Sequence, residues 1–359
     1  MKRPWFARPL QLATGTFRHD GKPNYRFILG LALFGATQIL AVVLASWHDK
    51  SFFLPPPGRG LMQHYGAGAI LVSDAFFLVA AGFAFSRFKL AMRDAPLLGG
   101  ADVRRRWEYL VDRSSGWVEA RGYPAYAYIV AVVLGMASWL VNVRNTIHPE
   151  YPNHYSHDVF DGWSHVVGFV VFKICLFASW VVVFPIVGYL LLMMSYATWA
   201  TLHSAQRNKL LAARVTHPDG CYGFAKFGEL NISILAPFLL AYAVMLSLWL
   251  THARPYETLL LPMAGMTIAF LSASYFALYP LYIVIRDART KMFDKLRDQA
   301  TELNDEDRTQ FTIERLCFES AKSTPYDSGM RLFLLAMRGL TIGTTAVTFF
   351  VRYRGLIGI

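Results

Sequence analysis

Two ionisable residues of opposite charge, Asp74 and Lys173, lie inside long apolar runs of this chain. If both runs are helices that cross a membrane, each residue lies roughly 10 to 12 Å below the same membrane surface, because an α-helix rises about 1.5 Å per residue. Gln38 and Thr267 reach comparable depths in two further apolar runs. The sequence therefore predicts a polar layer inside a bundle of membrane helices.

The residue types of this layer fit two interpretations. An ionisable group is expensive inside a bilayer and is a functional hypothesis by default. In the first interpretation, Asp74 binds a cation in a water-filled vestibule or ion pathway, and Lys173 is its alternating partner. In the second, the two side chains form a buried ion pair that orients the helices, because an unpaired charge would be costly to keep there. On the sequence alone we favour the second.

A group of imidazoles and carboxylates lies before and at the start of the fourth apolar run. Its members are His148, His154, His157, Asp158, Asp161 and His165. Such side chains bind zinc, copper, nickel or non-haem iron, so a divalent metal ion is a candidate cofactor. No established spacing such as His-Glu-x-x-His occurs among them. Exposed histidines in a polar loop are the commoner explanation, and imidazoles that sense the outside pH are a third.

A turn before the fifth apolar run contains a second candidate ligand set. Its members are His217, Asp219, Gly220, Gly223 and Glu229. In a structural interpretation, Asp219 caps the helix that follows, and the two glycines permit positive φ. In a functional one, His217 and Asp219, with Glu229, bind a cation, a headgroup or a cytoplasmic ligand. We favour a sharp structural turn that returns the chain to the membrane.

The same turn resembles one in a group of uncharacterised bacterial multi-pass inner-membrane proteins. In that group, His-Pro-Asp is followed by paired glycines and a leucine, where this chain has Tyr222 for the first glycine and Phe224 for the leucine. The Thr-Pro-Tyr-Asp sequence at 324–327 resembles a second landmark of the group. The resemblance covers about the C-terminal half and implies a bacterial inner-membrane location without an activity.

The elements that must position these residues are apolar helices. The 359 residues are 55% hydrophobic and only 16% charged, which is more apolar surface than the core of a soluble domain absorbs. A helix needs roughly 20 apolar residues to cross a bilayer. Six runs qualify, at 27–47, 67–85, 125–141, 165–194, 231–250 and 258–285. We therefore predict an all-α, polytopic transmembrane bundle in a single domain spanning 1–359.

Lysine and arginine are distributed unevenly between the connections of the predicted spans. The N-terminal segment and the connections after spans two, four and six hold 27 of them, and the alternate connections hold 4. Basic residues near span ends tend to stay cytoplasmic, so we predict a cytoplasmic N-terminus in a plasma membrane. The net charge of +11 then indicates contact with anionic membrane lipids, and we expect no nucleic acid partner.

Segments outside the six runs also have a helical pattern. Apolar residues at three- and four-residue spacing predict an amphipathic helix over 102–121, lying at the headgroup boundary. A second cytoplasmic helical segment is predicted over 289–320, with a break near 304–307. The run 332–351 is either a seventh crossing or a re-entrant or interfacial helix. A seventh crossing would place the two arginines that follow the run on the outer side of the membrane, against the charge rule, and a re-entrant or interfacial helix would not.

Two function classes remain for this sequence, because it lacks several familiar functional motifs. The chain has no phosphate-binding loop, no hydrolase motif and no histidine near the centre of a predicted span for an axial haem ligand. The first class is an ion or small-solute channel or transporter, either monomeric or a homo-oligomer, that uses the polar layer. The second is a non-transporting membrane sensor or a subunit of a membrane complex. A lipid-modifying enzyme, with His217 and Asp219 as its acid and base, is a distant third.

Overall fold

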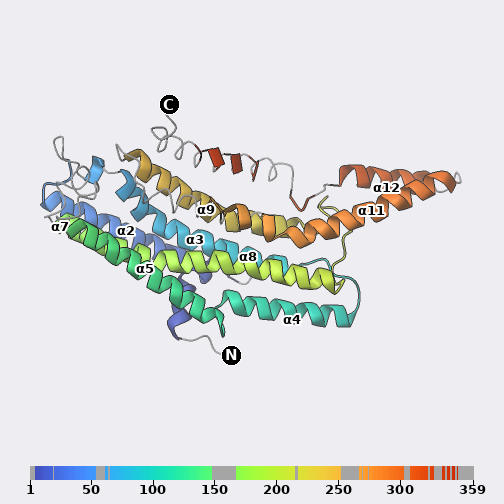
Figure 1. Ribbon diagram of the computed structural model, residues 1–359, viewed down its shortest axis with the longest axis horizontal. Coiled ribbons are helices and arrows are strands. Elements are labelled where there is room, and N and C mark those ends of the chain that lie inside the picture. Colours follow the sequence, from blue (N-terminus) through green and yellow to red (C-terminus); the bar gives the residue numbers. More distant parts are fainter. Residues whose placement is uncertain are drawn as a thin grey trace, which may run out of the picture.

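The computed structural model describes most of the chain as helices (Figure 1). The described residues are 5–18, 20–53, 61–63, 65–147, 167–214, 217–251, 267–268, 270–273, 275–302, 308–321, 324–326, 334–335, 338–339, 342–343 and 346. Within them the elements are η1 (Trp5–Leu10), α1 (Gln11–Thr14), α2 (Tyr25–His48), η2 (Leu61–Gln63), α3 (Tyr65–Arg93), α4 (Ala101–Val118), α5 (Pro124–Ile147), α7 (Val167–Phe177), the π-helix η3 (Ala178–Val183), α8 (Phe184–Arg207), α9 (Ala225–Thr251), α11 (Tyr279–Glu302) and α12 (Arg308–Ser320). These ranges contain no β-strand, which confirms the all-α prediction for the described part.

Four helical stretches are long and apolar enough to cross a membrane. They are Tyr25–His48, Ala69–Arg93, Val170–Arg207 and Ala225–Val244, and α5 adds a shorter apolar stretch, Pro124–Leu140. They overlap the first five predicted runs, although the stretch Val170–Arg207 continues 13 residues past the predicted end at 194. Most of the sixth run before 267, and most of the ambiguous run 332–351, lie outside the described residues. The membrane-protein class is therefore supported, and the number of six spans stays a prediction.

The outward face of α2 explains why lipid must replace water around this bundle. Leu29, Leu33, Leu40 and Leu44 are 54 to 61% exposed. A row of leucines spanning about four turns of helix is too large an apolar patch for a monomeric soluble protein. Hydrocarbon covers such a face without the cost that water would impose.

One helical rod is much longer than a bilayer is thick. Val170–Arg207 spans 38 residues, or about 57 Å, against a hydrocarbon core of about 30 Å. The predicted amphipathic helix forms as α4, but it lies along the last part of this rod (Figure 1). The Trp107 indole donates to the Met92 carbonyl at 2.8 Å, and the Tyr189 hydroxyl donates to the Trp117 carbonyl at 2.6 Å. The apolar face of α4 therefore packs on protein.

The sixth predicted run is not one continuous helix. A turn at Ala277 and Leu278 interrupts it, and α11 begins at Tyr279. Pro280 explains the interruption, since it has no N–H and clashes with a preceding helical turn. Beyond the run, α11 and α12 lie side by side, and Lys295 of α11 donates to Glu314 of α12 at 2.8 Å. The predicted break near 304–307 lies outside the described residues, which include α11 up to Glu302 and α12 from Arg308.

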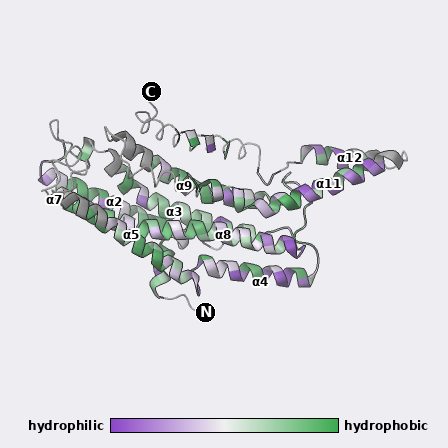
Figure 2. Cartoon of the chain, in the orientation of Figure 1, coloured by the Kyte–Doolittle hydropathy of each residue, from purple (hydrophilic) through white to green (hydrophobic). Residues whose placement is uncertain are grey.

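Polar residues gather at one end of the bundle, which we call the basic end (Figure 2). It comprises the α3–α4 connection, α4, the α8–α9 connection, α11 and α12. The two connections are joined by backbone hydrogen bonds, from Leu98 N to the Leu210 carbonyl at 2.9 Å and from Ala212 N to the Pro96 carbonyl at 3.0 Å. This end carries the connections that the charge distribution predicts to be cytoplasmic.

The N-terminal segment packs into the bundle, which its basic composition did not predict. Ala7, Leu10 and Ala13 are fully buried. A side chain at Gly82 of α3 would meet the Ala13 carbonyl at 2.2 Å, so only glycine permits this contact. The close contact at Gly82 therefore lets α1 pack against the middle of α3.

Candidate functional site

The centre of the predicted polar layer is a buried carboxylate. Asp74 of α3 is 0% exposed, and its Oδ2 accepts a hydrogen bond of 2.6 Å from the hydroxyl of Ser179. Its other oxygen, Oδ1, is buried and has no hydrogen-bond partner among the described residues. A carboxylate with an unused oxygen in a protein interior is costly, so it marks a place where a ligand or a proton would be stabilised.

Two further residues bring α2 and α7 into the layer. Gln38 is buried, and its side-chain oxygen also lacks a hydrogen-bond partner within the described part of the chain. The thiol of Cys175 lies 4.0 Å from the backbone carbonyl of Gln38, and the backbone carbonyl of Cys175 lies 3.5 Å from the Ser179 hydroxyl. The polar layer thus joins α2, α3 and the α7–η3 rod.

Lys173 and Thr267 are also buried, at 9% and 8% exposure. Lys173 is on α7, where the indole of Trp139 from α5 donates to its carbonyl at 3.1 Å. Among the described residues, the side chain that donates a hydrogen bond to the Asp74 carboxylate is Ser179. An ion pair between Asp74 and Lys173 therefore stays a prediction, as does a place for Thr267 in the layer.

The layer lies where the long rod changes its helical geometry. Ser179 is in the π-helix Ala178–Val183, whose wide turns leave backbone carbonyls displaced from α-helical positions. A side chain added at Gly135 of α5 would lie 2.1 Å from the carbonyl of Trp180. The π-helix is therefore fitted tightly against α5, and wide turns of this kind frequently occur at functional sites.

An apolar cavity of about 430 Å³ lies on the same helices, further toward the basic end. Leu78, one turn after Asp74, and Ala178, next to Ser179, both line it. Arg26, just inside the start of α2, is the one charged residue in its wall. The polar layer thus adjoins an apolar cavity on its side toward the basic end.

The predicted metal ligands of the outer loop lie outside the described residues. This applies to His148, His154, His157, Asp158, Asp161 and His165. Elsewhere, in the part of the chain that the structure describes, no group of three histidine, cysteine or acidic residues could hold a metal ion. A divalent metal at the outer loop stays a prediction.

The predicted turn before α9 forms around Asp219. Its carboxylate accepts backbone hydrogen bonds from Cys221 at 2.8 Å, Gly223 at 3.0 Å and Ala225 at 3.2 Å. The imidazole Nδ1 of His217 lies 3.0 Å from the carboxylate. Burial raises the pKa of Asp219, but these hydrogen bonds together outweigh it and hold the pKa below its ordinary value. The bonds occupy both carboxylate oxygens, which supports the structural interpretation.

Backbone conformation explains the glycines of this turn. Gly220 and Gly223 have φ of 62° and 90°, as the sequence predicts. Tyr222, between these two glycines, also has positive φ, at 60°. A side chain at this φ is unfavourable by roughly 1–2 kcal/mol, so packing of the fully buried Tyr222 ring must stabilise it.

The segment 324–326 contacts the same helix. The carbonyl of Pro325 lies where a side chain at Gly228 of α9 would be, at 2.1 Å, so only glycine fits there. One turn later, the amide of Asn231 donates to the buried hydroxyl of Tyr326. The Asp219 turn and the segment 324–326, which are distant in sequence, therefore both contact the first turns of α9.

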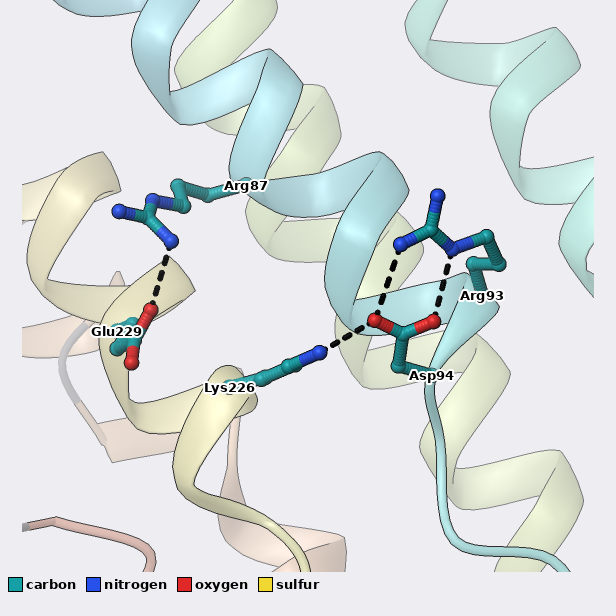
Figure 3. Close-up of polar contacts among 5 residues, drawn as sticks. All are labelled: Arg87, Arg93, Asp94, Lys226 and Glu229. Carbon is teal, nitrogen blue, oxygen red and sulfur yellow. Dashed lines mark hydrogen bonds and ion pairs between the residues drawn. The ribbon is translucent and has the colours of Figure 1, made fainter. Parts of the chain in front are cut away.

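Glu229 belongs to a different contact from the rest of the predicted ligand set. It accepts a hydrogen bond of 2.9 Å from Arg87 of α3, as Figure 3 shows. In the same view, Asp94 lies between Arg93 and Lys226 and is bonded to both. These ion pairs join the C-terminal end of α3 to the start of α9. Glu229 therefore links α3 to α9 and is not a member of the turn around Asp219.

Ser179 and Cys175 are the members of the polar layer that the sequence did not single out. They are four residues apart in the fourth apolar run, which is the spacing of one helical face. Small polar residues at that spacing, in a run that also carries Lys173, are a signal that could have located them. The oxygen atoms of Asp74 and Ser179, 2.6 Å apart, are of the type that hard cations and protons prefer. Comparison of the chain with protein-family models, with curated proteins and with solved structures finds no match for it.

Proposed function

We propose that this protein moves protons or small cations across a membrane through the polar layer, with Asp74 as the central binding group. The observation that carries the proposal is the fully buried Asp74 carboxylate, which has one oxygen on Ser179 and one oxygen without a partner in the described part. An apolar core would be more stable at this place, so a function explains why a carboxylate is kept.

The surroundings of Asp74 support this role. Oxygen atoms suit hard cations, and the hydroxyl of Ser179 could donate to the carboxylate or accept from a hydrated ion. The cavity of about 430 Å³ beside the layer supplies space in the direction of the basic end. Apolar stretches of this kind gate ion routes in other proteins by expelling water. Lys173, if it approaches Asp74 during transport, would compete with the cation for the carboxylate.

The orientation that accompanies this proposal comes from the charge distribution: the basic end would face the cytoplasm, with the N-terminus on that side. The bacterial inner membrane is the location that the resemblance implies. Membrane lipids are then the first partners, followed by a second copy of the chain or another membrane protein.

Flux in liposomes tests the proposal. Purified protein would be reconstituted, and proton and potassium fluxes would be measured with a pH-sensitive dye and an ion-selective electrode. We expect Asp74→Asn to lower the flux at least tenfold. Ser73→Ala is the matched control, because, among the described residues, the Ser73 hydroxyl bonds within its own helix, to the Ile70 carbonyl at 2.8 Å. Absence of flux in the folded wild-type protein, or equal flux in both variants, would overturn the proposal.

A second function is favoured by the exposed surface of the α11–α12 hairpin. Phe293, Ile313 and Leu316 are 55 to 59% exposed on helices that project from the bundle (Figure 1). Such residues would be covered in a non-transporting sensor or subunit of a membrane complex. Under this function, Asp74→Asn changes stability alone, and replacing Phe293 and Leu316 by serine abolishes assembly with the partner.

A further inference from the structure

A cavity of about 800 Å³ lies at the basic end, away from the polar layer. It is bounded by both joined connections and by one side of α11. Leu97 and Leu211 contribute apolar wall from the connections, and Val284 and Met292 contribute it from α11. No function described above uses this cavity.

The wall of this cavity is held in place by backbone pairing. Leu97 and Leu211 form an antiparallel bridge, with hydrogen bonds on either side of it. Leu211 is 8% exposed, and Leu210 beside it is 3% exposed. The cavity therefore has a wall that is formed before any ligand arrives, which lowers the entropic cost of binding.

Cations dominate the charged lining. Lys209, Arg214, Lys291 and Lys295 line the cavity, against one acidic residue, Asp287. Lys295 is bonded to Glu314 at 2.8 Å. Within the described ranges, no ion pair involves Lys209, Arg214 or Lys291. Three exposed cations beside an apolar wall favour an amphiphilic anion over a purely polar or a purely apolar ligand.

The C-terminal end of α8 fixes the backbone position of Lys209 at the rim of the cavity. Its N–H donates to the Gln206 carbonyl at 3.0 Å, and the next N–H, of Leu210, donates to the Ala205 carbonyl at 2.9 Å. This is a Schellman motif, in which the residue at the Lys209 position has positive φ and is usually glycine. Lys209 has φ of 52°. The backbone thus presents a cation at a place where the geometry favours a residue without a side chain.

One side of the cavity lies at a change from apolar to charged residues. In α11, Val284 lies two residues before Arg286, where the charged part of that helix begins. In a membrane helix such a change occurs near the level of the lipid phosphates. A phospholipid headgroup is therefore one source of an anion for this cavity.

We propose that this cavity binds a phosphate group, with Lys209, Arg214 and Lys291 around the phosphate and the apolar wall against the adjoining carbon chain. An anionic phospholipid and a soluble phosphate ester share this chemistry. The site shares no residue with the polar layer, so phosphate binding can be tested independently of ion transport.

Thermal unfolding of the full-length protein in a neutral detergent tests the site. The melting temperature would be followed as phosphatidylglycerol, phosphatidylcholine or glycerol 3-phosphate is added at constant ionic strength. We expect phosphatidylglycerol to raise it with a saturable titration. Replacing Lys209 and Lys291 together by glutamine should shift the midpoint about thirtyfold to higher concentration, roughly fivefold for each cation removed.

The matched control removes two cations that do not line the cavity, by Lys22→Gln with Arg106→Gln, and should leave the midpoint unchanged. If the cavity variant does not fold, Arg214→Gln alone should shift the midpoint about fivefold. A response to phosphatidylglycerol alone identifies a lipid, and an equal response to glycerol 3-phosphate identifies a soluble ester. An equal response to phosphatidylcholine, or an equal shift in the control variant, overturns the proposal.

Discussion

The carboxylate of Asp94 offers a quantitative test of the link between α3 and α9. Arg93 donates to it through Nε at 2.8 Å and through Nη2 at 3.2 Å, and Lys226 of α9 bonds to it from the other side (Figure 3). Hydrogen bonds from Arg93 and Lys226 lower the pKa of Asp94 from 3.8 to about 2, although partial burial acts in the opposite direction. The charged carboxylate therefore stabilises the folded state.

The size of this effect follows from the pKa. A fall from 3.8 to about 2 corresponds to roughly 2.4 kcal/mol. Arg93 and Lys226 are 63% and 51% exposed, so screening by water and salt reduces the expected contribution to about 1–2 kcal/mol. Because the folded-state pKa is depressed, the contribution is present in full above pH 4 and is lost as the pH falls toward 2.

The perturbation is Asp94→Asn, and the assay is denaturant unfolding in detergent between pH 7 and pH 2.5. The variant should be less stable by about 1–2 kcal/mol at pH 7, and the two proteins should converge as the pH falls. Asp102→Asn is the control, since its carboxylate is 85% exposed and pairs only with Arg105 of its own helix. A difference at pH 7 within about 0.5 kcal/mol, or one of constant size down to pH 2.5, would refute the reasoning.

Three further predictions concern backbone geometry, and thermal unfolding at pH 7 checks each. Asp219→Ala leaves three N–H groups without their acceptor and should lower stability by about 1–3 kcal/mol, whereas an unchanged melting temperature would contradict the capping role. Gly135→Ala forces a methyl group against the Trp180 carbonyl and should lower the free energy of unfolding by about 1–3 kcal/mol. Gly188→Ala is the control and should not lower it, because no atom lies within 4 Å of the added carbon. Equal effects of the two substitutions would contradict the close packing at Gly135. Lys50, at φ of 55° after α2, is strained, so Lys50→Gly should gain up to about 1 kcal/mol and Lys50→Ala should not. Equal melting temperatures for the two Lys50 variants would argue against strain there.

The parts of the fold that depend on local pattern could be predicted from the sequence. Apolar length located the helices that contain Asp74 and Lys173. The three- and four-residue spacing around Trp107 predicted α4, and the residue types at Asp219, Gly220 and Gly223 predicted both a cap and two positive φ angles. In each case the deciding interaction is between residues that are close in sequence.

Other features depend on contacts that a sequence pattern does not contain. Ser179 reaches Asp74 from a π-helix, which no propensity distinguishes from an α-helix in an apolar run. The burial of α1 depends on the missing side chain of Gly82, and the wall of the cavity at the basic end depends on the pairing of Leu97 with Leu211. α4 was expected at the membrane surface because its apolar face had no visible partner, and the partner is a rod long enough to extend beyond the bilayer.

The π-helix has a consequence for how this chain is aligned with others. Each residue of an α-helix turns by about 100°, and a wide turn accommodates roughly one additional residue. The segment before Ala178 packs on α2, and the segment after Val183 packs on α4, so one continuous helix changes neighbours across η3. A homologue with an uninterrupted α-helix here would keep both sets of contacts only with one residue fewer. An alignment should therefore place a single-residue gap inside 178–183, and one without that gap would pair every later position of α8 with the wrong face.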